Sequence, residues 1–373
     1  MSRAIKYIIV FFIFVLGARA LGINGLIAQS RTNQLVVDSD PRGASEVTIC
    51  SQNLNNYGLL PDVVRRTPSM LAERLADKEV GLVKRFVKAG CDIVAVQEVL
   101  GRDEETSNKA LTRLATKLHF SSNRSWDVVT GPSNDPMLRN GYVFAKDRAE
   151  MLSRLSYAKV ELPKMIEQEK PRSFSRGPLE VQFAVKGQGE APAKTVVIIN
   201  FHLKSKRGGA GDPAQLEWET ARMQMTEALR RIIANRHKGS LVSGEVPLIL
   251  LGDRNSNFDA ASAKILDGTL SLAMFQGAGV CRLSKRGIPL CQAGQAKSPN
   301  LFSVLTTDPQ TKFLTGTHRF NKEYSWLDEI LIATPSLPAA WERFDSTGDY
   351  ASGVVYEPRE VSDHALVWVR LNW

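Results

Sequence analysis

The sequence predicts an α/β protein in which β-sheets pack face to face and helices lie outside them. Short apolar segments typical of strands recur from residue 46 to the C-terminus, and only a few segments have helical periodicity. The two kinds neither alternate strictly nor separate into blocks, which favours packed sheets in mixed order. With 43% apolar and 23% charged residues, the composition is that of a globular chain, long enough for one large domain or two small ones.

The N-terminal 28 residues differ from the rest. Arg3 and Lys6 precede a short apolar run, and the small-residue stretch Ala18-Arg19-Ala20 follows it. This is the layout of a secretory signal with a cleavage site. The run is too short to predict a membrane span, but apolar residues continue to Ala28, so an uncleaved anchor stays open.

Three segments follow from this. We expect residues 1–28 to be a signal peptide or N-terminal anchor, residues 29–45 to be a polar linker, and residues 46–373 to form the folded domain. The protein is then exported, periplasmic or extracellular, and is membrane-anchored if the first segment is retained.

The helices have recognisable ends. One is expected to begin at Thr67-Pro68, a capping hydroxyl followed by proline, and to end at Gly90. A second fits residues 104–119. A third is expected to begin at Asp212-Pro213-Ala214-Gln215, with Gln at the capping-box position. Its buried face is expected to consist of Met225, Leu229, Ile232 and Ile233.

Strands are expected wherever short apolar runs are bounded by turn residues. In chain order these runs are 46–51, 91–99, 141–146, 179–185, 195–200, 246–253, 325–333 and 364–371. Residues 161–178 are rich in proline and charge, and residues 270–318 lack clear periodicity. We expect the latter stretch to form surface loops.

Charge and cysteine content narrow the function classes. The formal net charge is +9, and without the first 28 residues the chain carries 45 basic against 39 acidic residues. A moderately basic protein suits a polyanionic substrate or an anionic surface.

Cys50 and Cys91 lie in or beside apolar strands and are expected to be small core residues. Cys281 and Cys291 flank a polar segment and are a candidate disulfide in an exported protein.

Polar residues gather where the strands begin or end. Asn53, Glu98, His202, Asp253 and Asn255 follow strands, and Asp328, Asp363 and His364 stand at strand starts. In an antiparallel pair one strand's exit and its neighbour's entry share a sheet edge, so these side chains are expected to converge on one rim. Each alone also suits a turn or a solvated strand end, but their coincidence at strand boundaries favours a site.

The chemistry of the set is coherent. Carboxylate and amide oxygens suit Mg²⁺ or Mn²⁺. Histidines such as His202 and His364 can carry protons or donate hydrogen bonds to a phosphate near neutral pH. An acid such as Asp328 can orient an imidazole. No Cys-x-x-Cys and no His-Glu-x-x-His occurs, so nothing predicts a zinc site.

These residues carry a resemblance. "SQNLNNYG", "IVAVQEV", "NFHLKSK", "LLGDRNSN", "SWLDEILIA" and "SDHALVWV" occur in the order of the endonuclease/exonuclease/phosphatase superfamily, over about residues 46–373. The chain resembles pancreatic-type deoxyribonucleases and abasic-site endonucleases, and "HLKSK" resembles a stretch of secreted bacterial nucleases. The most specific pieces are Gln97-Glu98, Gly252-Asp253-x-Asn255 and Ser362-Asp363-His364.

The resemblance implies a four-layered α/β sandwich of two packed mixed β-sheets with helices outside, and makes residues 46–373 a catalytic domain. It implies that Asn53 and Glu98 hold the metal, with Asp363 close by. Other roles concern the reaction itself.

In the superfamily, the residue at His364 is the general base or activates water, and Asp328 would orient it. His202 would contact the scissile phosphate or assist the leaving group. Asp253 and Asn255 would position the nucleophile and the phosphate oxygens. The base is assigned either to the histidine or to the aspartate of the Gly-Asp-x-Asn motif, and both stay open.

Two departures concern the substrate. Glu329 follows Asp328, where histidine is more frequent, and residues 276–310 match no pattern of the superfamily. Neither removes a catalytic residue.

The leading hypothesis is an exported, Mg²⁺-dependent phosphoric diester hydrolase, a nuclease acting on DNA or RNA. Lys204, Lys206 and Arg207 follow His202 and are expected to bind the substrate's phosphate backbone. The alternatives are a phospholipid or sphingomyelin phosphodiesterase, with residues 299–314 as the nearest membrane-binding candidate, and a phosphomonoesterase. A non-catalytic binding module fits the intact residue set less well. No protein partner is predicted.

Overall fold

The computed structural model describes residues 46–186, 192–206, 216, 218–291, 295–307, 316–336 and 352–372. The expected signal or anchor, the linker, Arg207 and the helix start at Asp212 lie outside these residues. Within them, no helix combines the length and the apolar character that crossing a bilayer requires.

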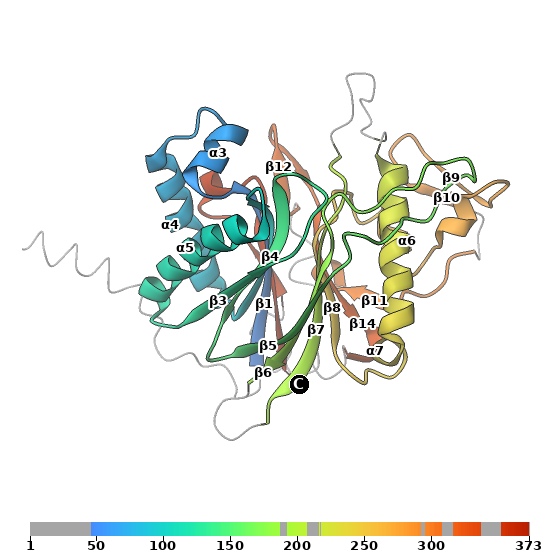
Figure 1. The fold of residues 1–373 in the computed structure, drawn as a ribbon. Coiled ribbons are helices and arrows are strands. Elements are labelled where there is room, and N and C mark those ends of the chain that lie inside the picture. The colour runs from blue at the N-terminus through green and yellow to red at the C-terminus, as the bar shows by residue number, and fades with distance from the viewer. Residues whose placement is uncertain are drawn as a thin grey trace, which may run out of the picture. The chain divides into compact units, whose positions relative to one another are not determined.

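Two six-stranded mixed sheets form the centre of the fold (Figure 1). The first sheet has the order β15-β16-β1-β2-β4-β3. Its strands are β1 (Glu46–Tyr57), β2 (Ile93–Leu100), β3 (Trp126–Thr130), β4 (Leu138–Ala145), β15 (Ser352–Val355) and β16 (Leu366–Asn372). The second has the order β11-β14-β8-β7-β6-β5. Its strands are β5 (Ala149–Ser156), β6 (Leu179–Val185), β7 (Lys194–His202), β8 (Leu248–Asp253), β11 (Leu301–Ser303) and β14 (Asp328–Ala333).

Each sheet has one parallel pair at its centre, β1 with β2 and β7 with β8, and the other pairs are antiparallel. Parallel neighbours need a crossover, and helices supply both. The first crossover contains α3 (Leu60–Arg66) and α4 (Ala72–Ala89), and the second contains α6 (Glu219–Arg236) and α7 (Lys238–Val242). The strands of each parallel pair therefore end at the same edge of their sheet.

The helices make the outer layers, so the predicted four-layered sandwich is confirmed. Figure 1 shows α4 and α5 (Glu104–Ser122) on one outer side and α6 on the other. One apolar cluster fills the space between the sheets, and two more lie beneath the helices. The run Leu248–Leu251 serves two layers, because Ile249 and Leu251 face the other sheet while Leu248 and Leu250 face α6. A strand buried on both faces reads as a continuous apolar run.

The helix ends were predicted with mixed success. Gly90 caps α4 in the left-handed conformation, at φ 65°, as expected. The start at Thr67-Pro68 is wrong: Thr67 instead caps the end of the separate helix α3, and α4 begins at Ala72. The second helix begins at Glu104, where the Asp103 side chain accepts a hydrogen bond from Thr106 N. The expected buried face of α6 is confirmed.

Residues 270–318 contain more structure than surface loops. The short elements are η1 (Leu272–Phe275), β9 (Cys281–Leu283), β10 (Pro289–Cys291), β11 and α9 (Val304–Thr307), and α8 (Ala261–Leu266) precedes them. Leu301, Val304 and Leu305 are fully buried. They pack against the second sheet, which a search for periodicity in so short a segment does not detect. The remaining elements are β12 (His318–Phe320), β13 (Glu323–Ser325), η2 (Thr334–Ser336) and η3 (Arg359–Val361).

All four cysteines are paired. Cys281 and Cys291 face each other in the β9–β10 hairpin and form the expected disulfide, with a Cα–Cα distance of 4.4 Å. Cys50 and Cys91 are buried, but the prediction that they are only small core residues is wrong, because they also form a disulfide across the β1–β2 pair, with a Cα–Cα distance of 5.9 Å. The parallel pairing brings them together from 41 positions apart. Two disulfides indicate an oxidising compartment.

Candidate active site

The strand-end residues of the two sheets converge, as the strand order requires. In the second sheet, Asp253 is the register partner both of His202, on the parallel neighbour, and of Asp328, on the antiparallel one. In the first sheet, Asn53 pairs with Gln97. The two edges meet where Asn53 Nδ2 donates a hydrogen bond to Asp253 Oδ2 at 3.0 Å.

The Gly-Asp-x-Asn turn has a specific backbone. A Cβ atom on Gly252 would lie 1.9 Å from the carbonyl oxygen of Phe201, so only glycine lets β8 approach β7 here. Asn255 adopts φ 56°. Asn255 N then donates to Asp253 Oδ1 at 2.8 Å, and its Nδ2 donates to Oδ2 at 3.1 Å. Asp253 and Asn255 thus do form a turn, and the hydrogen bonds of that turn hold the Asp253 carboxylate in place.

Asp253 is the centre of the site. Its Oδ2 lies 3.4 Å from His202 Nε2 and 3.7 Å from His364 Nε2, in addition to the two amide contacts. The side chain is buried. Burial raises the pKa of Asp253 to about 6, against the attraction of His364 and with added repulsion from Asp328 and Glu98.

His364 is held from both ring nitrogens. Its Nδ1 faces the two oxygens of Asp328 at 3.1 and 2.8 Å, and its Nε2 faces Asp253. Burial lowers the pKa of His364, but the charges of Asp328 and Asp253 outweigh it and raise the pKa to about 10. The two carboxylates therefore favour the imidazolium form of this ring at neutral pH.

His202 is buried in a different environment. Its Nε2 faces Asp253, and no described group hydrogen-bonds to its Nδ1. Burial, and then the positive charges of Arg176 and His364, lower the pKa of His202 well below its usual range. This ring is neutral.

The predicted metal ligands lie around the same centre. Glu98, at φ 59°, accepts a hydrogen bond from Asn56 N at 3.0 Å and lies 3.4 Å from Asn53 Nδ2. Asn53 Oδ1 accepts from Asn55 N at 2.9 Å, so its amide nitrogen faces the carboxylates. Asp363 is partly exposed. Burial raises its pKa, but the hydrogen bond from His318 and the charge of His364 lower the pKa to about 2.

The donor set suits a divalent cation. Among the described residues, Asp253, Asp328 and His364 form one group whose potential ligand atoms lie within 4.8 Å of one another, and His318, Asp363 and His364 form another. His364 has no free ring nitrogen when doubly protonated, so the carboxylates are the donors that count. Repulsion from Asp328 and Glu98 contributes to the raised pKa of Asp253, and a cation among the carboxylates would relieve it. Carboxylate oxygens dominate, which favours a hard ion.

The two described members of the expected basic substrate-binding group, Lys204 and Lys206, have different surroundings. Lys204 lies over the Trp218 ring, with 4.3 Å from its Nζ to the ring centroid. Lys206 lines a cavity of about 400 Å³ beside Asn255, together with Arg222 and Arg286. Burial, and then Arg222, lower the pKa of Lys206. Arg207 lies outside the described residues.

Several residues of the site were missed from the sequence. Arg176 stands just before β6, at the same edge as His202, and donates to the Leu203 carbonyl. Its position just before a strand is the same signal that marked the other site residues, and it was overlooked for β6. Lys78 is a buried cation on α4 that donates to Asn55 O at 2.6 Å. Burial lowers the pKa of Lys78 to about 8, against the attraction of Glu98 and Asp363.

The unusual Glu329 is explained by Arg254, the variable residue of the Gly-Asp-x-Asn turn. Arg254 Nη1 and Glu329 Oε2 form a buried ion pair at 2.5 Å, and Arg254 Nη2 donates to Trp326 O at 3.2 Å. Glu329, which stands where histidine is more frequent in the superfamily, is therefore neutralised by Arg254. The ion pair ties the end of β8 to the start of β14.

No protein-family model matches the sequence, and no curated protein matches it. Solved structures do match in fold. The human Nocturnin catalytic domain with bound sulfate is 14% identical, with a TM-score of 0.51, over 87% of this chain and 94% of that one. An endonuclease/exonuclease/phosphatase family protein from Bacteroides thetaiotaomicron gives the same values. Humanized D. rerio TDP2 is 14% identical, with a TM-score of 0.50, over 88% and 100%. The resemblance seen in the sequence is thus confirmed for the fold.

Proposed function

We propose, for a chain that folds as endonuclease/exonuclease/phosphatase proteins do, that it is an exported, Mg²⁺- or Mn²⁺-dependent phosphodiesterase acting on nucleic acid. One observation carries the proposal: a single buried oxygen, Asp253 Oδ2, is faced by two imidazole Nε2 atoms and two side-chain amides. Phosphoryl transfer depends mainly on positioning and charge stabilisation, and this cluster offers both.

The residues divide the work by geometry. His364 has a carboxylate at each ring nitrogen, so it keeps its protons and donates from Nε2 to a phosphate oxygen. Asp253 is then the group that accepts the proton of the attacking water, with Asn255 orienting that water. His202 contacts the phosphate from the other side of Asp253. Of the two residues that the sequence left open as the base, we therefore propose Asp253.

The metal ligands in this proposal are Glu98, Asp363 and, through its amide oxygen, Asn53. In the structure that oxygen accepts a hydrogen bond from Asn55 N, and the opposite amide orientation would direct it toward Glu98. A bound divalent cation supplies charge neutralisation at the phosphate and a lower pKa for bound water. The charges of Glu98 and Asp363 both act on buried Lys78 and oppose the lowering of its pKa by burial, so Lys78 is a cation close to two of the proposed ligands.

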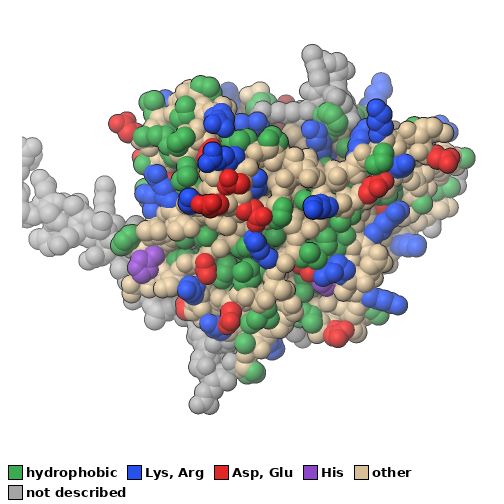
Figure 2. All heavy atoms as spheres, in the orientation of Figure 1, with side chains coloured by type: hydrophobic (Ala, Val, Ile, Leu, Met, Phe, Trp, Pro, Cys, Tyr) green, Lys and Arg blue, Asp and Glu red, His purple; other side chains and the backbone are tan. Residues whose placement is uncertain are grey.

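Nucleic acid is the favoured substrate because the chain is basic and cations line the cavity beside Asn255. On the face shown in Figure 2, Lys and Arg are scattered among Asp and Glu rather than gathered in one patch. We expect the phosphate contacts close to the site, where Lys206, Arg222 and Arg286 line the cavity beside Asn255. The two disulfides support export.

A lipid phosphodiesterase is the second candidate, and one observation favours it. The β12–β13 hairpin beside the site exposes Phe320, which is 48% accessible. In residues 299–307, the described part of the candidate chosen from the sequence, Leu301 and Leu305 are buried, so this part suits a membrane less well. The hairpin tip, Asn321-Lys322, is polar, which argues against insertion.

A substrate panel tests the proposal. Single-stranded and duplex DNA, RNA, sphingomyelin vesicles, bis(p-nitrophenyl) phosphate and p-nitrophenyl phosphate are incubated with and without Mg²⁺ or Mn²⁺. We expect cleavage of nucleic acid and of the diester, lost with EDTA and reduced at least about 10²-fold in Glu98→Gln. The exposed variant Glu105→Gln is the control. Full activity in metal-free protein, or cleavage of sphingomyelin alone, would overturn it.

A further inference from the structure

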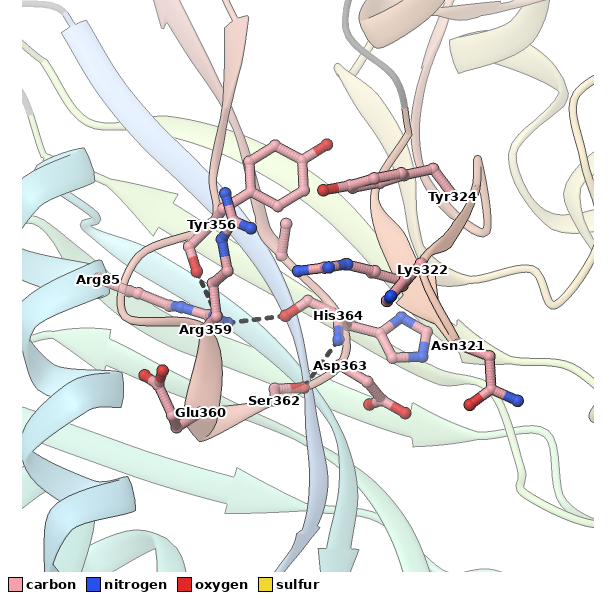
Figure 3. A pocket seen from close by; sticks show the side chains of 12 residues that line it. Arg85, Asn321, Lys322, Tyr324, Tyr356, Arg359, Glu360, Ser362, Asp363 and His364 are labelled. Atoms are coloured by element: carbon pink, nitrogen blue, oxygen red, sulfur yellow. Dashed lines mark hydrogen bonds between the residues drawn. The ribbon is translucent and has the colours of Figure 1, made fainter.

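A cavity of about 340 Å³ opens beside the catalytic rim (Figure 3). The β12–β13 hairpin forms one wall with Arg319, Lys322 and Tyr324, and the segment that leads into η3 forms the other with Tyr356 and with Arg359, the first residue of η3. The floor consists of Asp363 and His364. We call it the hairpin cavity.

The hairpin cavity combines aromatic faces with cations. Figure 3 shows Tyr324 and Tyr356 pointing toward each other across it, and their ring centroids are 6.3 Å apart at an interplanar angle of 86°. The Arg319 guanidinium lies 5.6 Å from the Tyr324 ring centroid. Arg359 pairs with Glu357 at 2.8 Å, and Arg85 is bound to backbone carbonyls, so Arg319 and Lys322 are the lining cations without an acidic or carbonyl partner among the contacts described. Aromatic rings with adjacent cations are the surfaces on which single-stranded bases stack.

Both walls are tied to the catalytic segment. Arg319 N donates to Asp363 O at 3.0 Å, and Ala365 N donates to Thr317 O at 2.7 Å. These backbone hydrogen bonds attach the hairpin to the turn that carries His364. On the other wall, buried Arg85 donates to the carbonyls of Tyr356 and His364, both at 2.7 Å. A ligand in the cavity is therefore held at a fixed position relative to His364.

We propose that the hairpin cavity binds one unpaired nucleotide flanking the scissile phosphate, so that the substrate class is single-stranded nucleic acid or unpaired ends. The inference rests on the proposed function. Lys322 and Arg319 contact the phosphate of that nucleotide, and Tyr324 stacks on its base. A base still paired and stacked within a duplex does not enter such a cavity, because it must first be extruded at a cost in stacking and pairing energy.

The first measurement is cleavage. Initial rates are compared on a single-stranded oligodeoxynucleotide and the blunt duplex of the same sequence, for the wild type and for Tyr324→Ala, Tyr324→Phe and Lys322→Ala. Phe120→Ala and Lys146→Ala are matched controls: both residues are exposed and neither lines this cavity or the one beside Asn255. Lys146 follows β4 at the sheet edge opposite the site.

We expect the wild type to favour the single strand by about 10-fold or more, and Tyr324→Ala to lower that rate by about 10-fold. Tyr324→Phe keeps the aromatic face and should retain most of the rate, which separates stacking from misfolding. Lys322→Ala should lower the rate several-fold and reduce its salt dependence. The controls should match the wild type.

The second measurement is binding, which decides the inference even if no cleavage occurs. Fluorescence anisotropy of a labelled oligothymidylate in EDTA should show about 10-fold weaker binding for Tyr324→Ala and no change for Phe120→Ala. Equal effects of Tyr324→Ala on single strand and duplex, or none on either, would refute the cavity's role while leaving the nuclease proposal intact. A wild type that binds the oligonucleotide through Tyr324 but cuts no nucleic acid would refute the proposed function instead.

Discussion

The two histidines of the site lie on either side of the same carboxylate, yet their surroundings are opposite. His364 is clamped by Asp328, and its backbone is held by Arg85 and by the β12–β13 hairpin. His202 has Asp253 on one nitrogen and no described hydrogen-bond partner on the other, with Arg176 nearby. Both are buried.

The difference shows that burial alone does not set the charge of a histidine. Burial disfavours the imidazolium in both rings. At His364 the charges of Asp328 and Asp253 overcome it, whereas at His202 the charges of Arg176 and His364 add to it, although Asp253 and Glu98 lie 3.4 and 3.9 Å from Nε2. One strand-end rim thus holds a charged ring and a neutral ring a few ångströms apart. Pairs of groups whose environments push their pKa values apart are a common basis of acid and base roles.

The largest expected effect is on catalysis. His364→Ala and Asp328→Ala should each lower kcat/KM by about 10²–10⁴-fold. Because the two residues act as one unit, the double variant should lose little more than the worse single variant. His202→Ala should add its own loss to either. Steady-state rates on bis(p-nitrophenyl) phosphate measure this, with exposed His119→Ala as the control. If the losses from His364→Ala and Asp328→Ala multiply fully in the double variant, the two residues do not act as one unit.

The next effect is on stability. It tests whether the Arg254–Glu329 ion pair holds β8, which carries Asp253, against β14, which carries Asp328. Arg254→Met should cost about 3–5 kcal/mol, because it leaves Glu329 buried and unpaired. The double variant Arg254→Met/Glu329→Leu should recover much of that loss. Urea unfolding of the wild type, Arg254→Met, Glu329→Leu and the double variant gives the coupling energy between the two side chains. Additive single losses would mean that the pair does not tie β8 to β14.

The pH dependence separates the two rings in metal-free protein. A pKa of His364 raised from 6.5 to about 10 means that the native state binds the proton more tightly than the unfolded state. Its stabilisation is complete below pH 6.5 and is lost as the pH rises through about 10. The lowered pKa of His202 has the opposite sign, so its contribution is lost as the pH falls below 6.5.

Nitrogen-15 NMR of the histidine rings checks this directly. The His364 ring should stay doubly protonated through pH 8, and the His202 ring should remain neutral at pH 6. Titration of both rings near pH 6.5 would break the comparison.

The smallest expected effect concerns the backbone under His364. Ser362 Oγ donates to Asn53 O at 2.8 Å and accepts from His364 N at 3.1 Å. Ser362→Ala should cost about 1–3 kcal/mol, since it leaves buried groups without a partner. Thermal unfolding measures this, with the exposed Ser153→Ala as the control. A cost near zero would show that Arg85 and the hairpin suffice to hold the segment.

The sequence supported much of the fold because its signals are local. Apolar runs bounded by turn residues located the central strands, and Gly90 located a helix end. Helix α3 and the buried Leu301 were missed, since segments of a few residues carry no period to read. The disulfide between Cys50 and Cys91 was also missed, because it depends on a parallel pairing that only the crossover helices create.

By itself the sequence determined which residues stand at strand ends, and therefore which side chains share a rim, because strand direction fixes where an end lies. Only the tertiary structure decided what each of them does there. The charge on His364 and its absence on His202, the orientation of the Asn53 amide, the pairing of Arg254 with Glu329 and the cavity beside Tyr324 all depend on distances between segments far apart in the chain. Electrostatic energies and hydrogen bonds change steeply over a few ångströms, and chain order does not encode those distances.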